Sequence, residues 1–199
     1  MKRKKIMLLG DSIMYGAKGI HGYGYYVRQK LENMADVFLP TDNCQDSRFT
    51  SCYFSDLIPE SDGDFDVIHW NNGLWDVLHF AGNPKPHVSA DNYRQALLTI
   101  YEKLSERYPR AAVVFAATTV VSEDLQKTAS YRRNEEIAEY NDLARSALAD
   151  KIDAIDDLYS VSLDLGDEYR AKDGLHYNED GARYLAEAVC RFLKDHKYI

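Results

Sequence analysis

The chain has 199 residues, of which 45% are hydrophobic and 28% are charged, a composition typical of a soluble globular protein. This length fits one domain, covering residues 1–199, better than two. The net charge of −8 disfavours nucleic acid and anionic membranes as partners, because like charges repel. The three cysteines lack the spacing of zinc ligands and indicate reduced thiols.

The amino-terminal segment does not fit the pattern of a signal peptide. Its apolar stretch, residues 6–9, is too short and is followed directly by Gly10 and Asp11. No segment approaches the length of a membrane span, so we expect a cytoplasmic location. The basic run at residues 2–5 is expected to be a solvated lead-in to the first strand, because no second basic cluster supports a binding role.

Short apolar runs alternate with longer amphipathic segments along the chain. Strands are predicted at residues 6–9, 37–39, 66–70, 112–116 and 152–155. Helices are predicted at residues 25–34, 89–108, 131–149 and 179–193, with Ser89 capping the second and Pro109 ending it. This alternation predicts a five-stranded parallel sheet covered by helices on both faces, a flavodoxin-like three-layer α/β/α sandwich.

Every predicted strand is followed by polar residues. In chain order these are Gly10-Asp11-Ser12, Asp42-Asn43-Cys44-Gln45, Asn71-Asn72-Gly73-Leu74-Trp75-Asp76, Thr118-Thr119 and, before the last helix, Asp173-Gly174-Leu175-His176. Sheets of this type bind ligands at the carboxyl ends of their strands. The functional residues are therefore expected among these groups.

Ser12 follows the first strand on a tight turn, where its hydroxyl can be exposed and its N–H can face an oxyanion. Taken alone, the segment fits a helix N-cap better. Asp173 and His176 are three residues apart, so both side chains can lie on one side of a turn. The carboxylate would then hold the imidazole Nδ1–H while Nε2 faces Ser12. Taken alone, this pair also fits a surface histidine at the start of a helix.

Together, these two motifs at opposite ends of the chain resemble those of the SGNH (GDSL-type) hydrolase family. The order of strands and helices between them also agrees. The resemblance implies an α/β/α sandwich that hydrolyses esters or thioesters without a metal or cofactor. It implies that Ser12 attacks the substrate, that His176 is the base and that Asp173 orients the imidazole. In this family the oxyanion hole uses the serine N–H, a glycine N–H after the second strand and an asparagine side chain after the third.

The sequence departs from the family pattern at two of these positions. The segment after the second strand lacks a glycine, and we predict that the N–H of Cys44 takes its place. Trp75 stands where the family has its asparagine. We predict Asn71 as the replacement amide donor, with Asn72 close behind; for each, an asparagine that only stabilises its own turn is an equal alternative.

Trp75 and Asp11 are the predicted substrate-binding residues. Trp75 is expected to be an acyl-site wall or a sugar-stacking platform, unless it is a core aromatic. For Asp11 the alternative role is a hydrogen bond to nearby backbone without a part in the chemistry. For Asp76 the alternative role is to brace its own loop. His69, inside the third strand, is expected to be a core or subsite residue.

These observations predict a serine esterase acting on short acyl esters, above all acetyl esters, of a carbohydrate or another polar alcohol. A lipase would show a large apolar entrance, whereas tyrosines, asparagines and acidic residues surround the predicted site. The alternatives are a thioesterase or lysophospholipase-type acyl hydrolase and a non-catalytic carbohydrate-binding relative with a degraded oxyanion hole. A flavodoxin-like nucleotide binder is disfavoured because the chain is acidic and lacks a phosphate loop. The expected partner is a small-molecule or oligosaccharide ester, and the oligomeric state stays open.

Overall fold

The computed structural model describes residues 3–17, 19–61, 63–126 and 129–199. At its centre is a five-stranded sheet of order β4-β1-β5-β6-β7 in which all neighbours are parallel. Its strands are β1 (Lys4–Leu9), β4 (Ala35–Phe38), β5 (Val67–Trp70), β6 (Ala112–Ala116) and β7 (Ala154–Asp156). A small antiparallel pair, β2 (Gly16–Ala17) and β3 (Ile20–His21), follows β1. The predicted five-stranded parallel sheet is thus confirmed.

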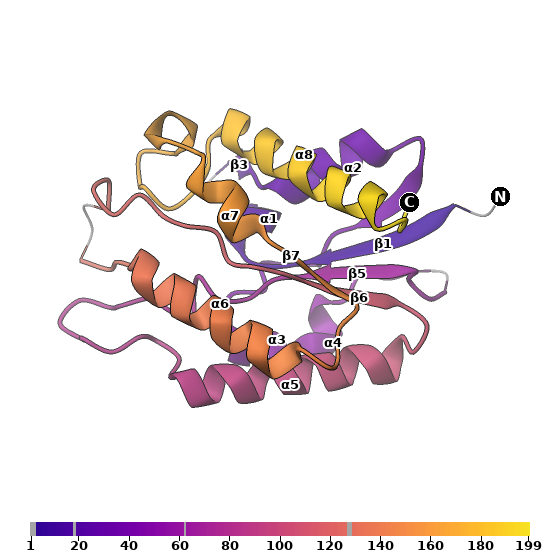
Figure 1. Ribbon diagram of the computed structural model, residues 1–199, viewed down its shortest axis with the longest axis horizontal. Helices are drawn as coiled ribbons and strands as arrows, with labels where there is room; N and C mark the ends of the chain where they lie inside the picture. Colours follow the sequence, from indigo (N-terminus) through magenta and orange to yellow (C-terminus); the bar gives the residue numbers. More distant parts are fainter. Residues whose placement is uncertain (1–2, 18, 62, 127–128) are drawn as a thin grey trace.

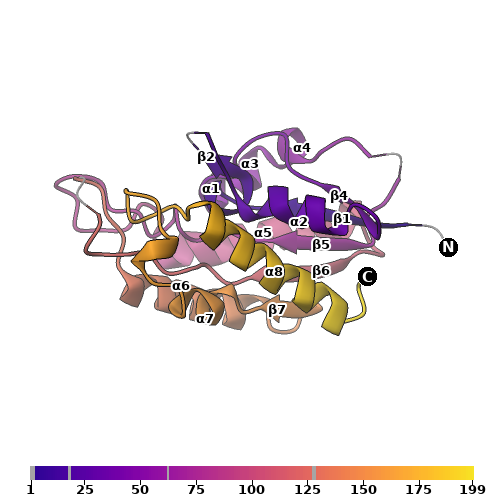
Figure 2. The same cartoon turned by 90° about the horizontal axis from the view of Figure 1, so that it is seen from above.

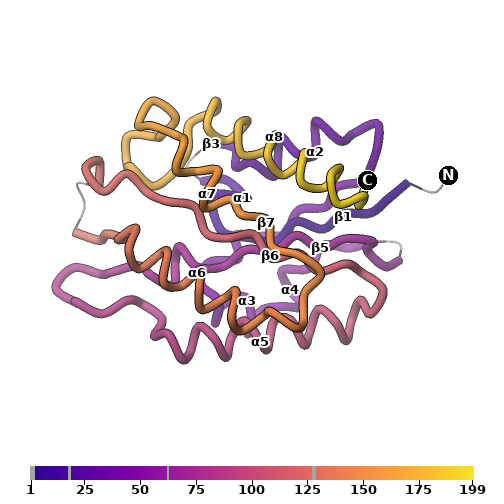
Figure 3. The backbone as a smooth tube through the Cα atoms, viewed as in Figure 1, coloured from indigo at the N-terminus to yellow at the C-terminus, as the bar shows by residue number. Residues whose placement is uncertain are grey.

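Helices cover both faces of the sheet, as predicted. The longer ones are α2 (Tyr23–Leu31), α5 (Ala90–Arg107), α6 (Asn134–Leu148) and α8 (Glu179–Asp195). The shorter ones are α1 (Ser12–Tyr15), α3 (Ser47–Cys52), α4 (Phe54–Leu57), α7 (Leu158–Leu163) and the 3-10 turn η1 (Asp167–Tyr169). Figure 1 shows α1, α2, α7 and α8 on one face and α3, α4, α5 and α6 on the other. Figures 2 and 3 show α8, the last helix, packed beside α2.

Apolar periodicity explains the main elements. The central strands β1 and β5 are buried along almost their whole length, as expected for strands covered on both faces. In α5 the buried side chains recur every three or four residues, and the Ser89 hydroxyl accepts the N–H of Asn92 at 3.4 Å, which caps the helix as predicted. Among the described helices, none combines the length and apolar sequence needed to span a membrane.

Several predicted helix boundaries differ from the structure, above all those of α6 and α2. α6 begins at Asn134 rather than at residue 131, because the backbones of Tyr131 and His79 pair with each other through N–H···O bonds of 3.1 and 2.8 Å. α2 begins and ends earlier than predicted, since Gly22 takes the extended conformation of its N-cap. The helices of six residues or fewer were not predicted, because so short a segment shows no clear periodicity.

The topology determines where a ligand site is expected. The chain leaves β1 for β4 on one side and then enters β5 on the other side, so β1 and β5 form the switch point of the sheet. Their ends are aligned: Leu9 pairs with Trp70, and the N–H of Asn71 donates to the Leu9 carbonyl at 3.0 Å. The residues after β1 and β5 therefore lie side by side.

Candidate active site

Ser12 is the first residue of α1 and follows the carboxyl end of β1. Asp11 caps this helix, since its Oδ1 accepts the N–H of Ile13 at 2.9 Å, the local backbone bond that was expected. Among the described residues, none accepts the N–H of Ser12, as is usual at the first position of a helix. This N–H is available to a ligand.

The segment that carries Asp173 and His176 is a turn before α8. Asp173 Oδ1 accepts the backbone N–H groups of Leu175 and His176 at 3.0 and 2.9 Å, which closes the turn. Gly174 has a φ of +70°, and its carbonyl oxygen accepts the N–H of Ser122 at 2.8 Å. The turn is thereby fixed to the loop after β6.

Ser12, His176 and Asp173 form one chain of hydrogen bonds although 164 positions separate the serine from the histidine. Asp173 Oδ2 lies 2.8 Å from His176 Nδ1, and His176 Nε2 lies 2.9 Å from Ser12 Oγ. Burial alone raises the pKa of the Asp173 carboxyl, but hydrogen bonds from His176 and Leu175 outweigh it and hold the pKa below its ordinary value. An ionised carboxylate only accepts, so Nδ1 carries the proton and Nε2 is free to take one from Ser12.

The predicted oxyanion donors other than Ser12 are engaged inside the protein. The N–H of Cys44 donates to the Gly10 carbonyl at 3.2 Å. The Asn71 amide donates to the Ala116 carbonyl at 2.7 Å, with a longer contact of 3.3 Å to a hydroxyl after β6. The Asn72 amide donates to the Gln45 carbonyl and to the Thr50 hydroxyl at 3.1 and 2.9 Å. In this structure these three groups do not offer a free donor, because strand-end carbonyls and loop oxygens already bind them.

Gln45 is a residue after β4 that the sequence did not single out. Its φ of +50° lies in the left-handed region that favours glycine. It directly precedes Asp46, the N-cap of α3, so it stands where the missing family glycine would fit better than at Cys44. Its N–H donates to the partly buried side chain of Asn43, at Oδ1, over 2.8 Å. A search for the residue before the α3 cap would have found it.

The loop after β5 is tightly held. Gly73 has a φ of +154°, and a Cβ there would lie 2.1 Å from the Thr118 hydroxyl oxygen. Asp76 is fully buried and accepts the N–H and hydroxyl of Ser47, so it braces the loop against α3, the alternative role considered for it. Trp75 is partly buried, and among the described residues its indole N–H has no hydrogen-bond partner. His69 is fully buried and bonded to Asp156 at 2.9 Å, in the core rather than at the rim.

Arg132 is a second residue that the sequence did not single out. It belongs to the loop between β6 and α6, and its Nε donates to the Leu74 carbonyl at 2.8 Å. Burial lowers its pKa to about 10, while the negative charges of Asp11 and Asp173 oppose that effect. Nothing in the local sequence distinguishes a buried loop arginine from an exposed one.

Hollows near the Ser12 hydroxyl are small. One of about 10 Å³ is lined by Ser12, His176 and the β2–β3 hairpin, and another of about 10 Å³ by Asp11, Leu74 and residues after β6. Each accommodates a group about the size of one water molecule. Among the described residues, no group of three or more His, Cys, Asp or Glu side chains is arranged to hold a metal ion.

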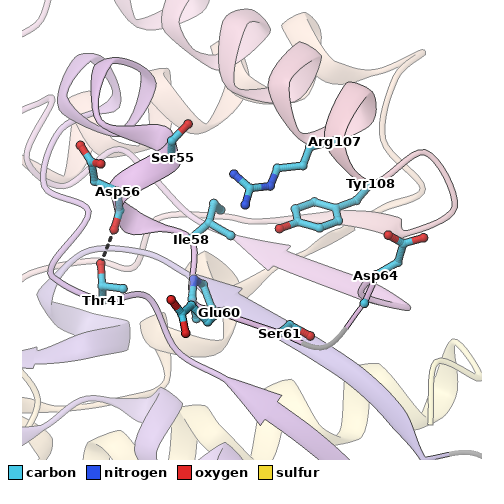
Figure 4. A pocket seen from close by; sticks show the side chains of 11 residues that line it. Thr41, Ser55, Asp56, Ile58, Glu60, Ser61, Asp64, Arg107 and Tyr108 are labelled. Carbon is cyan, nitrogen blue, oxygen red and sulfur yellow. Dashed lines mark hydrogen bonds between the residues drawn. The ribbon is translucent and has the colours of Figure 1, made fainter.

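A larger hollow of about 880 Å³ lies elsewhere (Figure 4). Arg107 and Tyr108, at the end of α5, face the loop of Ile58 and Glu60 across it, and Thr41 is bonded to the backbone of the neighbouring helix α4. None of Ser12, His176 and Asp173 lines this hollow. Ser12 and His176 instead line the small hollow of about 10 Å³.

Known proteins resemble this chain in sequence and in fold. The sequence model of the GDSL-like lipase/acylhydrolase family matches residues 8–184. A GDSL esterase/lipase of Arabidopsis thaliana is 24% identical over 217 residues, covering 98% of this chain and 88% of that protein. The structure of the lipase/acylhydrolase from Enterococcus faecalis superposes with a TM-score of 0.74 at 19% identity, covering 97% of this chain and 96% of that chain. The acetyl xylan esterase AlAXEase gives a TM-score of 0.72 at 17% identity, covering 95% and 99%.

Proposed function

Since this chain belongs to the GDSL-like lipase/acylhydrolase family, as its motifs predict, and is a carboxylic ester hydrolase, we propose that Ser12, His176 and Asp173 are its catalytic residues. The hydrogen-bonded chain that joins these three side chains is the observation that supports this assignment best. In this chain the base is in direct contact with both the nucleophile and the orienting acid.

The proposed reaction has two steps. His176 Nε2 takes the proton of Ser12 Oγ as that oxygen attacks the ester carbonyl, and the imidazolium then gives the proton to the leaving alcohol. Water, activated by His176, hydrolyses the acyl-enzyme and releases Ser12. The Ser12 N–H holds the oxyanion, and the Gln45 N–H joins it when the substrate oxygen displaces Asn43. Each such donor contributes roughly 10²–10³ in rate.

We propose a short acyl group, acetyl above all, on a carbohydrate or another polar alcohol. The hollows of about 10 Å³ beside Ser12 suit a methyl-sized acyl part and leave no room for a long chain. Two acetyl xylan esterases among the solved structures share the fold, AlAXEase and the Axe2 enzyme of Geobacillus stearothermophilus. The Axe2 structure superposes with a TM-score of 0.67 at 18% identity, covering 94% of this chain and 93% of that chain.

Hydrolysis of 4-nitrophenyl acetate, butyrate and octanoate tests this proposal. We expect acetate to be preferred, and Ser12→Ala to abolish its hydrolysis. The matched control is Ser146→Ala on the exposed side of α6, which leaves the rate unchanged. A preference for octanoate would contradict the acetylesterase proposal and favour a lipid acyl hydrolase or thioesterase. Equal rates for wild type and Ser12→Ala would refute Ser12 as nucleophile.

One observation favours a second candidate, a non-catalytic carbohydrate-binding relative. The N–H of Cys44 and the amides of Asn71 and Asn72 are all bonded within the protein, which weakens the oxyanion hole. Folded protein that hydrolyses none of the three esters but binds an acetylated oligosaccharide would establish this candidate instead.

A further inference from the structure

Arg132 lies at the edge of the proposed catalytic residues. Its Nε donates to the Leu74 carbonyl at 2.8 Å, and Leu74 lines the same small hollow as Asp11, the neighbour of Ser12. The guanidinium is also within electrostatic range of Asp11 and Asp173. The loop after β6 thus brings a positive charge to the carboxyl ends of β1 and β5, where a substrate is expected.

The backbone of Arg132 is held firmly on both sides. The Gln126 side chain accepts its N–H at 2.8 Å and donates to its carbonyl at 2.9 Å. The preceding Tyr131 is paired with His79, and the His79 ring, stacked on Tyr131, is bonded to Glu136 at 2.7 Å. A side chain on so fixed a backbone loses little further freedom when it binds a ligand.

The charge of Arg132 has no ion-pair partner among the described residues. The residue is only 7% exposed, yet the one hydrogen bond from its side chain to another described residue is the neutral contact from Nε to Leu74. No described residue accepts a hydrogen bond from its two terminal nitrogens, and neither nitrogen is fully buried. Both nitrogens therefore keep access to solvent. The carboxyl groups of Asp11 and Asp173 act on Arg132 only through space, because Asp11 is bonded to the N–H of Ile13 and Asp173 to His176. Burying a guanidinium in this way is costly unless an anion joins it.

We propose that Arg132 is a specificity-determining residue that binds a carboxylate carried by the ester substrate. This inference rests on the proposed esterase function and adds the chemical class of its substrate. The planar fork of the guanidinium matches a carboxylate through two parallel hydrogen bonds. Because the hollows beside Ser12 are small, the carboxylate belongs on the alcohol part, as in an acetylated uronic acid, rather than on the acyl group.

The kinetic test compares matched substrates. The first pair of substrates consists of the acetyl esters of a methyl glucuronide and of the corresponding glucuronamide, which differ in the charge of the alcohol part. The second pair consists of 4-nitrophenyl succinate monoester and 4-nitrophenyl acetate, of which the first carries a carboxylate on the acyl part. We expect wild type to prefer the glucuronide over the amide in kcat/KM. Arg132→Gln should lower that preference roughly 10- to 100-fold, the range for a hydrogen bond to a charged group. Arg132→Lys, which keeps the charge but not the fork, should fall between.

Arg133→Gln is the matched control, since Arg133 is exposed at the next position and its side chain contacts only Tyr131 among the described residues, through the ring face and a hydroxyl bond of 3.3 Å. It should change neither the preference nor the rate. A preference for the succinate monoester that Arg132→Gln removes would support the same carboxylate contact and move it to the acyl side. If Arg132→Gln lowers kcat/KM for charged and neutral esters alike while its circular dichroism stays native, Arg132 acts on every ester and the proposal is overturned.

A binding measurement separates this inference from the proposed function. Calorimetric titration of Ser12→Ala with methyl glucuronide needs no turnover; we expect binding that weakens at least tenfold for methyl glucuronamide or on adding Arg132→Gln. Equal affinity for the two ligands would overturn the carboxylate contact. Folded wild type that hydrolyses no ester would refute the proposed function while the titration still decides the role of Arg132.

Discussion

Asp76→Asn should change how stability depends on pH. Asp76 is fully buried after β5, and its carboxyl accepts the N–H of Ser47 at 3.1 and 3.2 Å and the hydroxyl at 2.5 Å. Burial raises its pKa from 3.8 to about 7; the Ser47 hydrogen bonds oppose this rise, and the charges of Asp46 and Asp11 add to it. Asparagine has the same shape and can keep one bond to each Ser47 group.

The size of the effect follows from the shift of about three pKa units, each equivalent to ~1.36 kcal/mol. Below pH 4 both the folded and unfolded states hold the proton, so the carboxyl costs nothing. As pH rises from about 4 to about 7 the unfolded state ionises first, and the wild type loses up to about 4 kcal/mol of folding free energy from this group. Above pH 7 both states are ionised and the loss is constant.

Urea unfolding of wild type and Asp76→Asn between pH 4 and pH 8 measures this difference directly. Asp76→Asn should gain stability relative to wild type as pH rises, because it carries no titrating group, while all other carboxyl groups cancel in the comparison. Asp150→Asn, at an exposed position, is the control and should show no such trend. A difference that varies by less than about 1 kcal/mol over this range would show that Asp76 is ionised throughout, and the argument from burial would fail.

Further predictions concern the turns that build the site. Gly73→Ala should lower the free energy of unfolding by about 3 kcal/mol, because the new Cβ would lie 2.1 Å from the Thr118 hydroxyl oxygen. The control is Gly82→Ala, where φ is +76° and the space is open; it should lower the free energy of unfolding by only about 1 kcal/mol in the same urea titration. Gln45→Val should cost about 1–2 kcal/mol, whereas Gln45→Gly should be tolerated, because the φ of +50° disfavours a β-branched residue; equal stabilities would contradict the left-handed conformation. Asp173→Asn should keep the fold but lower kcat roughly 10³- to 10⁴-fold, since the amide no longer holds the required imidazole tautomer; a loss below tenfold would remove Asp173 from the catalytic group.

Periodicity carried most of the fold prediction. The five strands and four longer helices are long or apolar enough to show a period, and burial of one face then determines their position. The start of α6 was wrong because the backbone of Tyr131 pairs with that of His79, far away in the sequence. Short helices such as α3 depend on a single cap, here Asp46, which accepts the N–H groups of Arg48 and Phe49. Such contacts determine where a helix begins or ends without producing a periodic pattern in the sequence.

The site residues that belong to a sequence motif could be predicted. Those whose role depends on contacts with distant parts of the chain could not. Ser12, Asp173 and His176 were selected from two motifs whose residues the structure then brings together, and their catalytic roles stay predictions. Cys44 was chosen to replace a glycine by its place in the segment, but only the backbone angle distinguishes it from Gln45. Asn71 was chosen for its amide, yet no sequence pattern shows that Ala116 already accepts that amide.

These engaged amides change how the oxyanion is stabilised. In the family pattern a side chain after the third strand is a donor, whereas here the Asn72 amide donates to the carbonyl of Gln45, the residue whose N–H we propose as a donor. In this proposal the Asn72 side chain supports a backbone donor instead of acting as a donor itself. Once the substrate oxygen has displaced Asn43 from the Gln45 N–H, a backbone donor on a turn held in this way needs little further reorganisation when charge develops on the substrate, which is the condition for strong electrostatic stabilisation. The departure from the motif is thus compatible with catalysis, provided that the Ser12 and Gln45 N–H groups act together on one oxygen.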